Sequence, residues 1–196
     1  MFANRFTALI DACCLAGTLK RNLLLTLAEA EFFRLRWSST ILDETEAAIR
    51  RILEDRGADD AAERASRARK FMEEAFEEAD VGDYESMLCA CDALPDPNDA
   101  HVLAAALKTQ AAIIVTDNLK DFPPAILGPL NLEARSADDF IADTVALDLG
   151  RAVAAVRAMR ERFTRPEKTA EALLLDMEAE GLTETVDVLR PHVASL

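Results

Sequence analysis

The chain of 196 residues is long enough for one ordinary domain and a small appendage. Its 36 acidic residues outnumber its 22 lysines and arginines, so the formal net charge is −14. This balance argues against a protein that grips nucleic acid through a broad basic surface and favours a basic partner. No apolar run approaches the roughly 20 residues of a membrane span, and the four cysteines lack the spacing of a usual zinc site. We therefore expect no membrane contact and a cytoplasmic protein with buried, reduced thiols.

The first part of the chain alternates short apolar strands with amphipathic helices. Apolar residues in continuous or alternating runs predict the strands, and apolar residues at helical spacing predict the helices. Ser38 and its neighbours are candidate caps for the second helix, and Gly57 ends it. The predicted elements are strands at residues 6–10 and 33–38 and helices at residues 15–33, 41–55 and 59–80.

The next part returns to the same alternation. A short helix is predicted at residues 86–92, a central apolar helix at 99–109, a strand at 112–115, a proline-rich loop at 122–129 and a last strand at 130–133. Strands that alternate with helices imply an α/β fold with a mainly parallel sheet covered by helices.

The composition changes after residue 136, where the strand patterns stop. Residues 139–163 and 166–193 predict two or three amphipathic helices, which Thr164-Arg165-Pro166 and Gly181 interrupt. We therefore predict two domains, at residues 1–138 and 139–196.

Acidic side chains recur where predicted strands end and helices begin. Asp11 ends the first strand, Glu44 lies in a first helical turn, Asp99 begins the central helix and Asp121 follows the strand after it. Taken singly, each has an ordinary explanation as a turn residue or a helix cap. In an open α/β sheet, however, these positions face one crevice outside the carboxyl ends of the strands. Carboxylates gathered in this way repel one another, so they need a cation unless they are protonated.

The kind of ligand indicates the kind of cation. Without nearby histidine or cysteine ligands, an all-oxygen set favours Mg²⁺ or Mn²⁺ over zinc. Divalent ions among carboxylates suit phosphoryl chemistry, because they activate a water and neutralise the leaving oxygen. The sequence has no GxxxxGK[ST] or GxGxxG motif, so it does not support a nucleotide cofactor.

Four motifs together resemble PIN-domain ribonucleases of the VapC type, which are toxins of bacterial toxin–antitoxin pairs. They are ALIDACCL around Asp11, SSTILDETEAAI around Glu44, LPDPNDAHVLAAAL around Asp99, and IIVTDNLKDFP near the end of the sheet. They occur in the family's order and cover about residues 5–135. The resemblance implies a three-layer α/β/α fold with a short, mainly parallel sheet. The helices after it resemble an extension found in one longer branch of these toxins.

The resemblance also implies a set of metal ligands. Asp11, Glu44 and Asp99 would hold Mg²⁺ or Mn²⁺, with Asp121 or Asp117 completing the set. Branches of the family place the last acid differently, and we favour Asp121.

Other polar residues near these acids receive supporting roles. Asn118 would be a polar neighbour or a water ligand, and Asp96 a further acid around the ligands. Thr116 would orient the cluster through its hydroxyl or simply close the strand. We expect His101 to be a packed or surface histidine rather than a base, since metal-bound water needs no histidine.

The function implied by the resemblance is metal-dependent endoribonuclease activity, in which water activated by the bound ion hydrolyses RNA phosphodiesters. As the toxin of a type II toxin–antitoxin system, the protein would form a homodimer. A cognate antitoxin would insert an Arg or Lys side chain into the acidic site. Two alternatives stay open: a PIN-type nuclease of RNA processing or quality control, and a non-catalytic PIN-like module that docks basic proteins.

Overall fold

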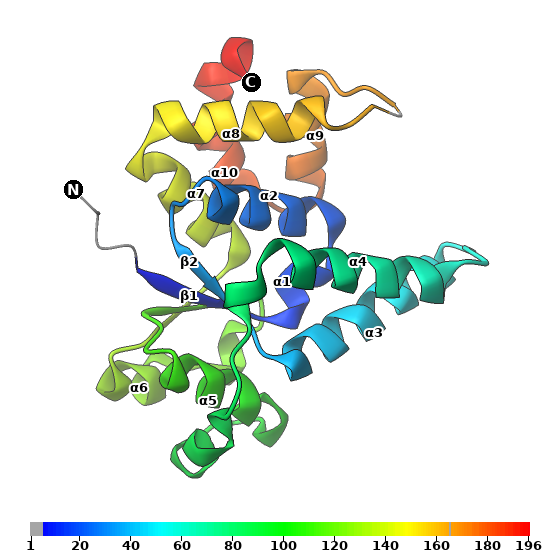
Figure 1. Ribbon diagram of the computed structural model, residues 1–196. Helices are drawn as coiled ribbons and strands as arrows, with labels where there is room; N and C mark the ends of the chain where they lie inside the picture. Colours follow the sequence, from blue (N-terminus) through cyan, green and yellow to red (C-terminus); the bar gives the residue numbers. More distant parts are fainter. Residues whose placement is uncertain (1–5, 165) are drawn as a thin grey trace. The chain divides into compact units, whose positions relative to one another are not determined.

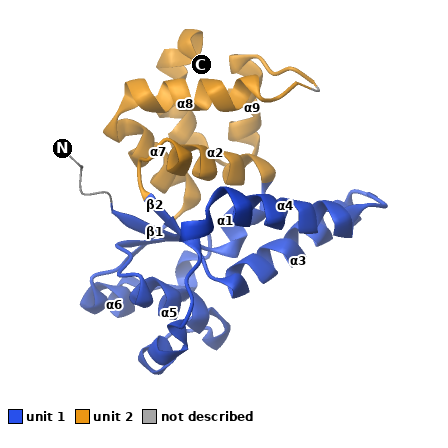
Figure 2. Ribbon diagram, viewed as in Figure 1, with its two compact units in different colours: residues 1–17, 34–135 blue, residues 18–33, 136–196 orange. Residues whose placement is uncertain are grey.

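The computed structural model describes residues 6–164 and 166–196 and divides the chain into two compact units (Figures 1 and 2). Unit 1 consists of Met1–Gly17 and Arg34–Arg135, and unit 2 of Thr18–Phe33 and Ser136–Leu196. The predicted domain boundary between residues 138 and 139 stays a prediction. These units divide the chain differently, because residues 18–33 belong with the C-terminal helices.

Unit 1 is built on a four-stranded parallel sheet with the strand order β2-β1-β3-β4. Ala8, Leu9 and Ile10 of the central strand β1 have no exposed surface, as expected for a strand covered on both faces. The predicted α/β fold with a mainly parallel sheet is therefore confirmed. The strands are β1 (Thr7–Ile10), β2 (Arg34–Arg36), β3 (Ile113–Val115) and β4 (Glu133–Arg135).

The last strand begins later than we predicted, at Glu133 rather than residue 130. A 3₁₀ turn occupies Gly128–Leu130, and Asn131 follows it with a φ of +55°. A strand cannot continue through this left-handed residue, so the chain turns here before it joins the sheet. The apolar pattern that suggested a strand at 130–133 belongs instead to this turn and to Leu132, which is buried.

The helices of unit 1 follow the predicted pattern in outline. Ser38 caps α3 by accepting a hydrogen bond from the Ile41 N–H at 3.3 Å. Two predictions are wrong: the helix predicted at 59–80 stops at Ala75, and the loop predicted at 122–129 contains a short helix that starts at Pro124. Proline suits this position because its fixed φ is already helical. The helices are α1 (Ala12–Ala16), α3 (Ser39–Asp55), α4 (Ala61–Ala75), α5 (Ala100–Lys108) and α6 (Pro124–Leu127), and the helix predicted at 86–92 is a 3₁₀ segment, Tyr84–Ala90.

Unit 2 consists of helices, as predicted for the C-terminal part of the chain. The helix predicted at 15–33 is instead two, because Gly17 separates α1 from α2 and the second ends at Glu29. The helix predicted at 139–163 is interrupted at Asp148, which caps the next helix. Gly181, with a φ of +81°, lies between the last two helices as expected. The helices are α2 (Thr18–Glu29), α7 (Ala137–Leu147), α8 (Leu149–Glu161), α9 (Ala170–Ala179) and α10 (Thr183–Leu189).

Aromatic contacts join the segment 18–33 to the C-terminal helices within unit 2. The rings of Phe33 and Phe140 meet edge to face with centroids 4.9 Å apart, and the guanidinium of Arg151 lies 4.9 Å from the Phe32 ring centroid. The predicted break at Thr164-Arg165-Pro166 includes Arg165, which lies outside the described residues. Across residues 6–164 and 166–196, no helix combines the length and apolar character needed to cross a membrane.

Candidate functional site

Asp11 follows directly after β1 and caps α1. Its side chain is buried, and its Oδ1 accepts a hydrogen bond from the Ala12 N–H at 2.6 Å. Its Oδ2 accepts one from the Thr116 hydroxyl at 2.7 Å and one from the Cys13 thiol at 3.2 Å. Because donors reach both oxygens, the carboxylate is held in one orientation at the carboxyl end of the sheet.

Thr116 connects Asp11 to the end of β3. Its hydroxyl donates to Asp11 and accepts a hydrogen bond from the Asn118 N–H at 3.1 Å. Asn118 therefore contributes its main chain to this network. The neighbouring Asp117 is exposed and donates its own N–H to the Cys13 sulfur at 3.3 Å. This bond places the Thr116 hydroxyl on Asp11, and its orienting role stays a prediction.

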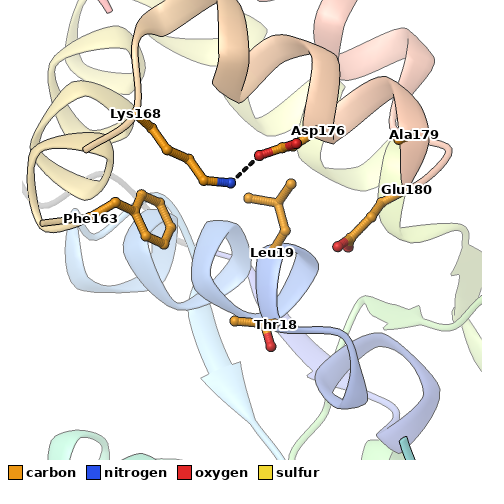
Figure 3. Close-up of a pocket in the computed structure, with 7 residues that line it drawn as sticks. All are labelled: Thr18, Leu19, Phe163, Lys168, Asp176, Ala179 and Glu180. Carbon is orange, nitrogen blue, oxygen red and sulfur yellow. Dashed lines mark hydrogen bonds and ion pairs between the residues drawn. The ribbon is translucent and has the colours of Figure 1, made fainter. Parts of the chain in front are cut away.

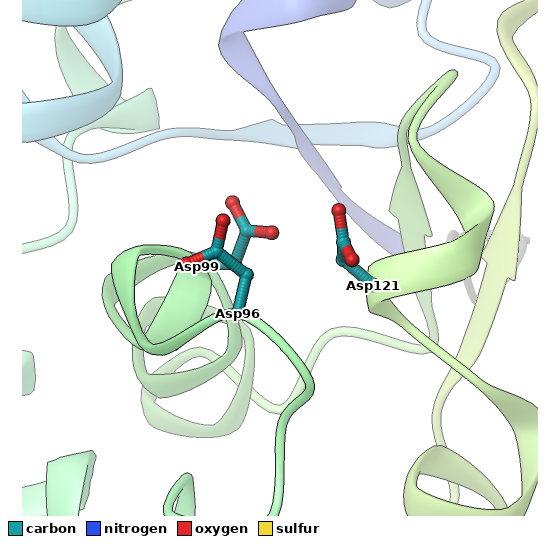
Figure 4. Close-up of side chains that lie close together, drawn as sticks. All are labelled: Asp96, Asp99 and Asp121. Atoms are coloured by element: carbon teal, nitrogen blue, oxygen red, sulfur yellow. The ribbon is translucent and has the colours of Figure 1, made fainter.

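Three aspartates converge beside this network (Figure 4). Asp96, Asp99 and Asp121 each offer a carboxylate oxygen, and these oxygens all lie within 4.8 Å of one another. Two of them come from the turn that leads into α5, and Asp121 ends a 3₁₀ turn, Leu119–Asp121, after β3. We call these three residues the aspartate cluster.

The charges of the cluster are incompletely balanced. Burial, followed by the negative charges of Asp11, Asp96 and Asp121, raises the pKa of Asp99 to about 6, and His101 opposes the shift. The Asp99 Oδ2 is buried and has no hydrogen-bond partner among the described residues. An oxygen-only donor set with an orphaned buried oxygen fits a hard divalent cation such as Mg²⁺ or Mn²⁺.

Glu44 approaches this region from α3. Its Oε1 lies 3.1 Å from Nε2 of His101, which is the second residue of α5. About half of the Glu44 side chain is exposed. Glu44 is not among the three carboxylates whose oxygens meet within 4.8 Å. Its connection to the first turn of α5 runs through the histidine.

The predicted ligands thus occupy different positions relative to the cluster. Asp99 and Asp121 are members of it, and Glu44 contacts His101. The negative charge of Asp11 raises the pKa of Asp99. Asp96, which we expected to support the ligands, is itself a member. Which of these residues bind metal stays a prediction.

Sequence reasoning missed Cys13. We expected buried cysteines, but Cys13 and Cys89 are exposed, and only Cys14 and Cys91 are buried. Cys13 lies two residues after Asp11, at the start of the helix that Asp11 caps, and its thiol donates to that carboxylate. The spacing from Asp11 was the available signal, but a cysteine is usually assigned to the core by its apolar character.

Unit 2 has a separate hollow of about 290 Å³ (Figure 3). It lies among α2, α9 and the segment before α9. The amine of Lys168 forms an ion pair with Asp176 and lies 5.3 Å from the Phe163 ring centroid. None of the predicted site residues lines this hollow. The lining residues are Thr18, Leu19, Phe163, Lys168, Asp176, Ala179 and Glu180.

Comparison with known proteins gives two family matches and one curated relative. Residues 7–120 match the PIN domain, and residues 137–191 match the VapC50 C-terminal domain. A protein of Mycobacterium tuberculosis strain H37Rv named "Putative ribonuclease VapC50" is 40% identical over 76 residues, which is 39% of this chain and 45% of that protein. The alignment therefore spans less than half of the relative's length. No solved structure matches the chain.

Proposed function

Because the chain belongs to the PIN-domain family, we propose that it is a metal-dependent endoribonuclease and the toxin of a type II toxin–antitoxin system. The observation that carries this proposal is the aspartate cluster, with three carboxylate oxygens within 4.8 Å of one another beside the buried Asp11. The match of residues 137–191 to the VapC50 C-terminal domain and the name of the curated relative support the toxin assignment.

In this proposal Asp11, Asp99 and Asp121 hold Mg²⁺ or Mn²⁺, with Glu44 as the further ligand and Asp96 beside them. When bound, a divalent cation lowers the pKa of a water and neutralises negative charge on a phosphodiester. The protein fixes the Asp11 carboxylate in advance, because it receives three hydrogen bonds from its surroundings. Ligands that are already oriented need less reorganisation when the cation and the RNA arrive.

Thr116 and Asp99 have separate tasks at this site. The hydroxyl of Thr116 keeps one oxygen of Asp11 in place while it accepts the Asn118 N–H. Asp99 is the carboxyl whose pKa is raised to about 6, so it takes up a proton most readily when no cation balances the cluster. Cation and proton therefore compete for this residue, and RNA cleavage should weaken in acid.

The proposed partners follow from charge. A cognate antitoxin would place an Arg or Lys side chain against the aspartate cluster, and the net charge of −14 favours association with a basic protein. The RNA substrate would be single-stranded and bound locally at the site. We further propose that the protein works in the cytoplasm as a homodimer, and its four unpaired cysteines agree with a reducing compartment.

Cleavage of single-stranded RNA by the purified full chain tests this proposal. Wild type should cleave with Mg²⁺ or Mn²⁺ and stop when EDTA is added. Asp99→Asn should lower the rate at least about 100-fold, as expected when one charge-stabilising group is removed. Asp187→Asn, an exposed acid of α10, is the matched control and should cleave like wild type. Equal rates for wild type and Asp99→Asn, or no cleavage with any divalent cation, would refute the proposed ribonuclease activity.

The toxin assignment has its own test. Expression of wild type in a bacterial host should arrest growth, and co-expression of the protein encoded beside it should restore growth. Cleavage of RNA in vitro without growth arrest would favour the RNA-processing alternative.

A further inference from the structure

His101 occupies a position that links two elements of unit 1. It is the second residue of α5, and only 13% of its side chain is exposed. Its Nε2 lies 3.1 Å from Oε1 of Glu44 on α3. It follows Asp99, which precedes α5, by two residues. The imidazole therefore connects Glu44 of α3 to the first turn of α5, which follows Asp99 directly.

The surroundings of the ring indicate which nitrogen carries the proton. Nδ1 is buried and has no hydrogen-bond partner among the described residues. A neutral ring protonated at Nδ1 would leave a donor unused and would set the bare Nε2 against a carboxylate oxygen. With the proton on Nε2, the ring donates to Glu44, so this is the arrangement that the contact requires.

Glu44 needs a hydrogen-bond partner to keep its carboxylate in one position. It is about half exposed, so water competes for its carboxylate. A glutamate on an exposed helix face also samples several rotamers, and fixing one of them costs conformational entropy. A hydrogen bond from a nearly buried ring on α5 opposes both effects.

We infer that His101 is a positioning residue, which holds the Glu44 carboxylate beside the first turn of α5 so that Glu44 can join the metal ligands. This inference rests on the proposed function. It assigns to His101 a role beyond the packed or surface histidine expected from sequence. The ring acts through Glu44, so replacing the ring should weaken metal binding only while Glu44 is present.

Calorimetric titration of the full chain with Mn²⁺ measures this effect without RNA. His101→Leu removes the donor and should raise the Kd about tenfold, as is typical when the partner of a metal ligand is lost. His101→Gln keeps an N–H at a similar distance from the backbone and should bind within about threefold of wild type. The control is His192→Leu, at the other of the two histidines in the chain, which should bind like wild type.

A double-mutant cycle separates positioning from general damage. Glu44→Ala should weaken Mn²⁺ binding, and adding His101→Leu to it should change the Kd less than twofold. A similar tenfold loss with and without Glu44 would overturn the inference. So would wild-type affinity in His101→Leu, or a His101→Gln variant as weak as His101→Leu. Thermal melts of each variant confirm that it is folded.

Nitrogen-15 NMR of the two histidines gives a readout that needs neither metal nor activity. In metal-free wild type at a pH where the ring is neutral, His101 should carry its proton on Nε2, and Glu44→Ala should abolish this preference. A proton on Nδ1 would overturn the inference. If the NMR and Mn²⁺ results hold while wild type cleaves no RNA, the proposed nuclease fails and the positioning role stands. If wild type binds no Mn²⁺, both fail.

Discussion

At the scale of single residues, Thr116 shows how much one hydroxyl organises. It is fully buried, donates to the Asp11 carboxylate and accepts from the Asn118 N–H. A threonine at a strand end also has an ordinary role in closing the strand, which is why the sequence left two roles open. The contact to Asp11 connects residues that are 105 positions apart, so no local pattern predicts it.

Thr116→Val removes that hydroxyl and keeps the shape of the side chain. The free energy of unfolding should fall by about 1.5–3 kcal/mol, because a buried charged acceptor loses a donor. Urea denaturation measures the change, and Thr116→Ser, which keeps the hydroxyl, should retain most of the stability. A valine variant as stable as wild type would show that the bond contributes nothing net.

The raised pKa of Asp99 predicts how the stability of the protein depends on pH. Its pKa is raised from 3.8 to about 6, so the folded metal-free protein binds this proton more tightly than the unfolded chain does. The stability that this proton confers is present in full below about pH 4 and is lost as the pH rises through about 6. Asp99→Asn removes the effect, so the variant should gain stability relative to wild type between those values.

Denaturation of both proteins in EDTA at a series of pH values measures that difference, and the other carboxylates largely cancel in the comparison. Added Mn²⁺ should stabilise wild type more at pH 7 than at pH 5. A difference between the two proteins that does not change from pH 4 to pH 7 would contradict the raised pKa.

At the scale of elements, a start marked by a side-chain cap was predictable, and boundaries set by a positive φ were not. Ser38 marks the start of α3 because a side-chain cap is a local signal. Glu31 and Asn131 end or delay elements through positive φ values of 61° and 55°, and neither residue type marks such a position alone. The acids at strand ends were predicted from local sequence. The placement of Asp96 within the cluster was not, because it depends on the turn into α5.

Asp138 provides a test at this scale, because it joins two helices of unit 2. Its carboxylate accepts hydrogen bonds from the N–H groups of Glu184 and Thr185 at 2.8 Å and from the Thr185 hydroxyl at 2.7 Å. Asp138→Ala should cost about 1–2 kcal/mol of stability, as the loss of a helix cap does. In thermal or urea unfolding, Asp187→Ala is the exposed control. Equal midpoints for the two variants would exclude a capping role.

At the scale of the whole molecule, the division into units does not follow chain order. Leu19, Leu23, Leu24 and Leu27 of α2 are buried, and their helix packs with α7 and α8 in unit 2. From sequence alone, α2 is predicted to belong with the strands on either side of it. Its partners lie more than one hundred residues ahead, and helical periodicity shows that a face is apolar without showing what covers it.

A chain cut after residue 138 tests the predicted domain boundary. Exposing each leucine of α2 costs roughly 1.5–3 kcal/mol, so four of them approach the total stability of an ordinary domain. We expect residues 1–138 alone to aggregate or to melt without a cooperative transition, as circular dichroism would show. If the fragment melts cooperatively at the temperature of the full chain, the domain at 1–138 is independent.

Because unit 2 is made of two separate chain segments, its parts are synthesised at different times. α2 leaves the ribosome early, but the 102 residues from Arg34 to Arg135 must be made before the rest of unit 2 begins. At about 5–20 residues per second, translation of that stretch takes roughly 5–20 s. During this delay the leucine face of α2 lacks α7 and α8, so a nascent chain should need protection by a chaperone. Unit 2 becomes complete only when the last helices emerge.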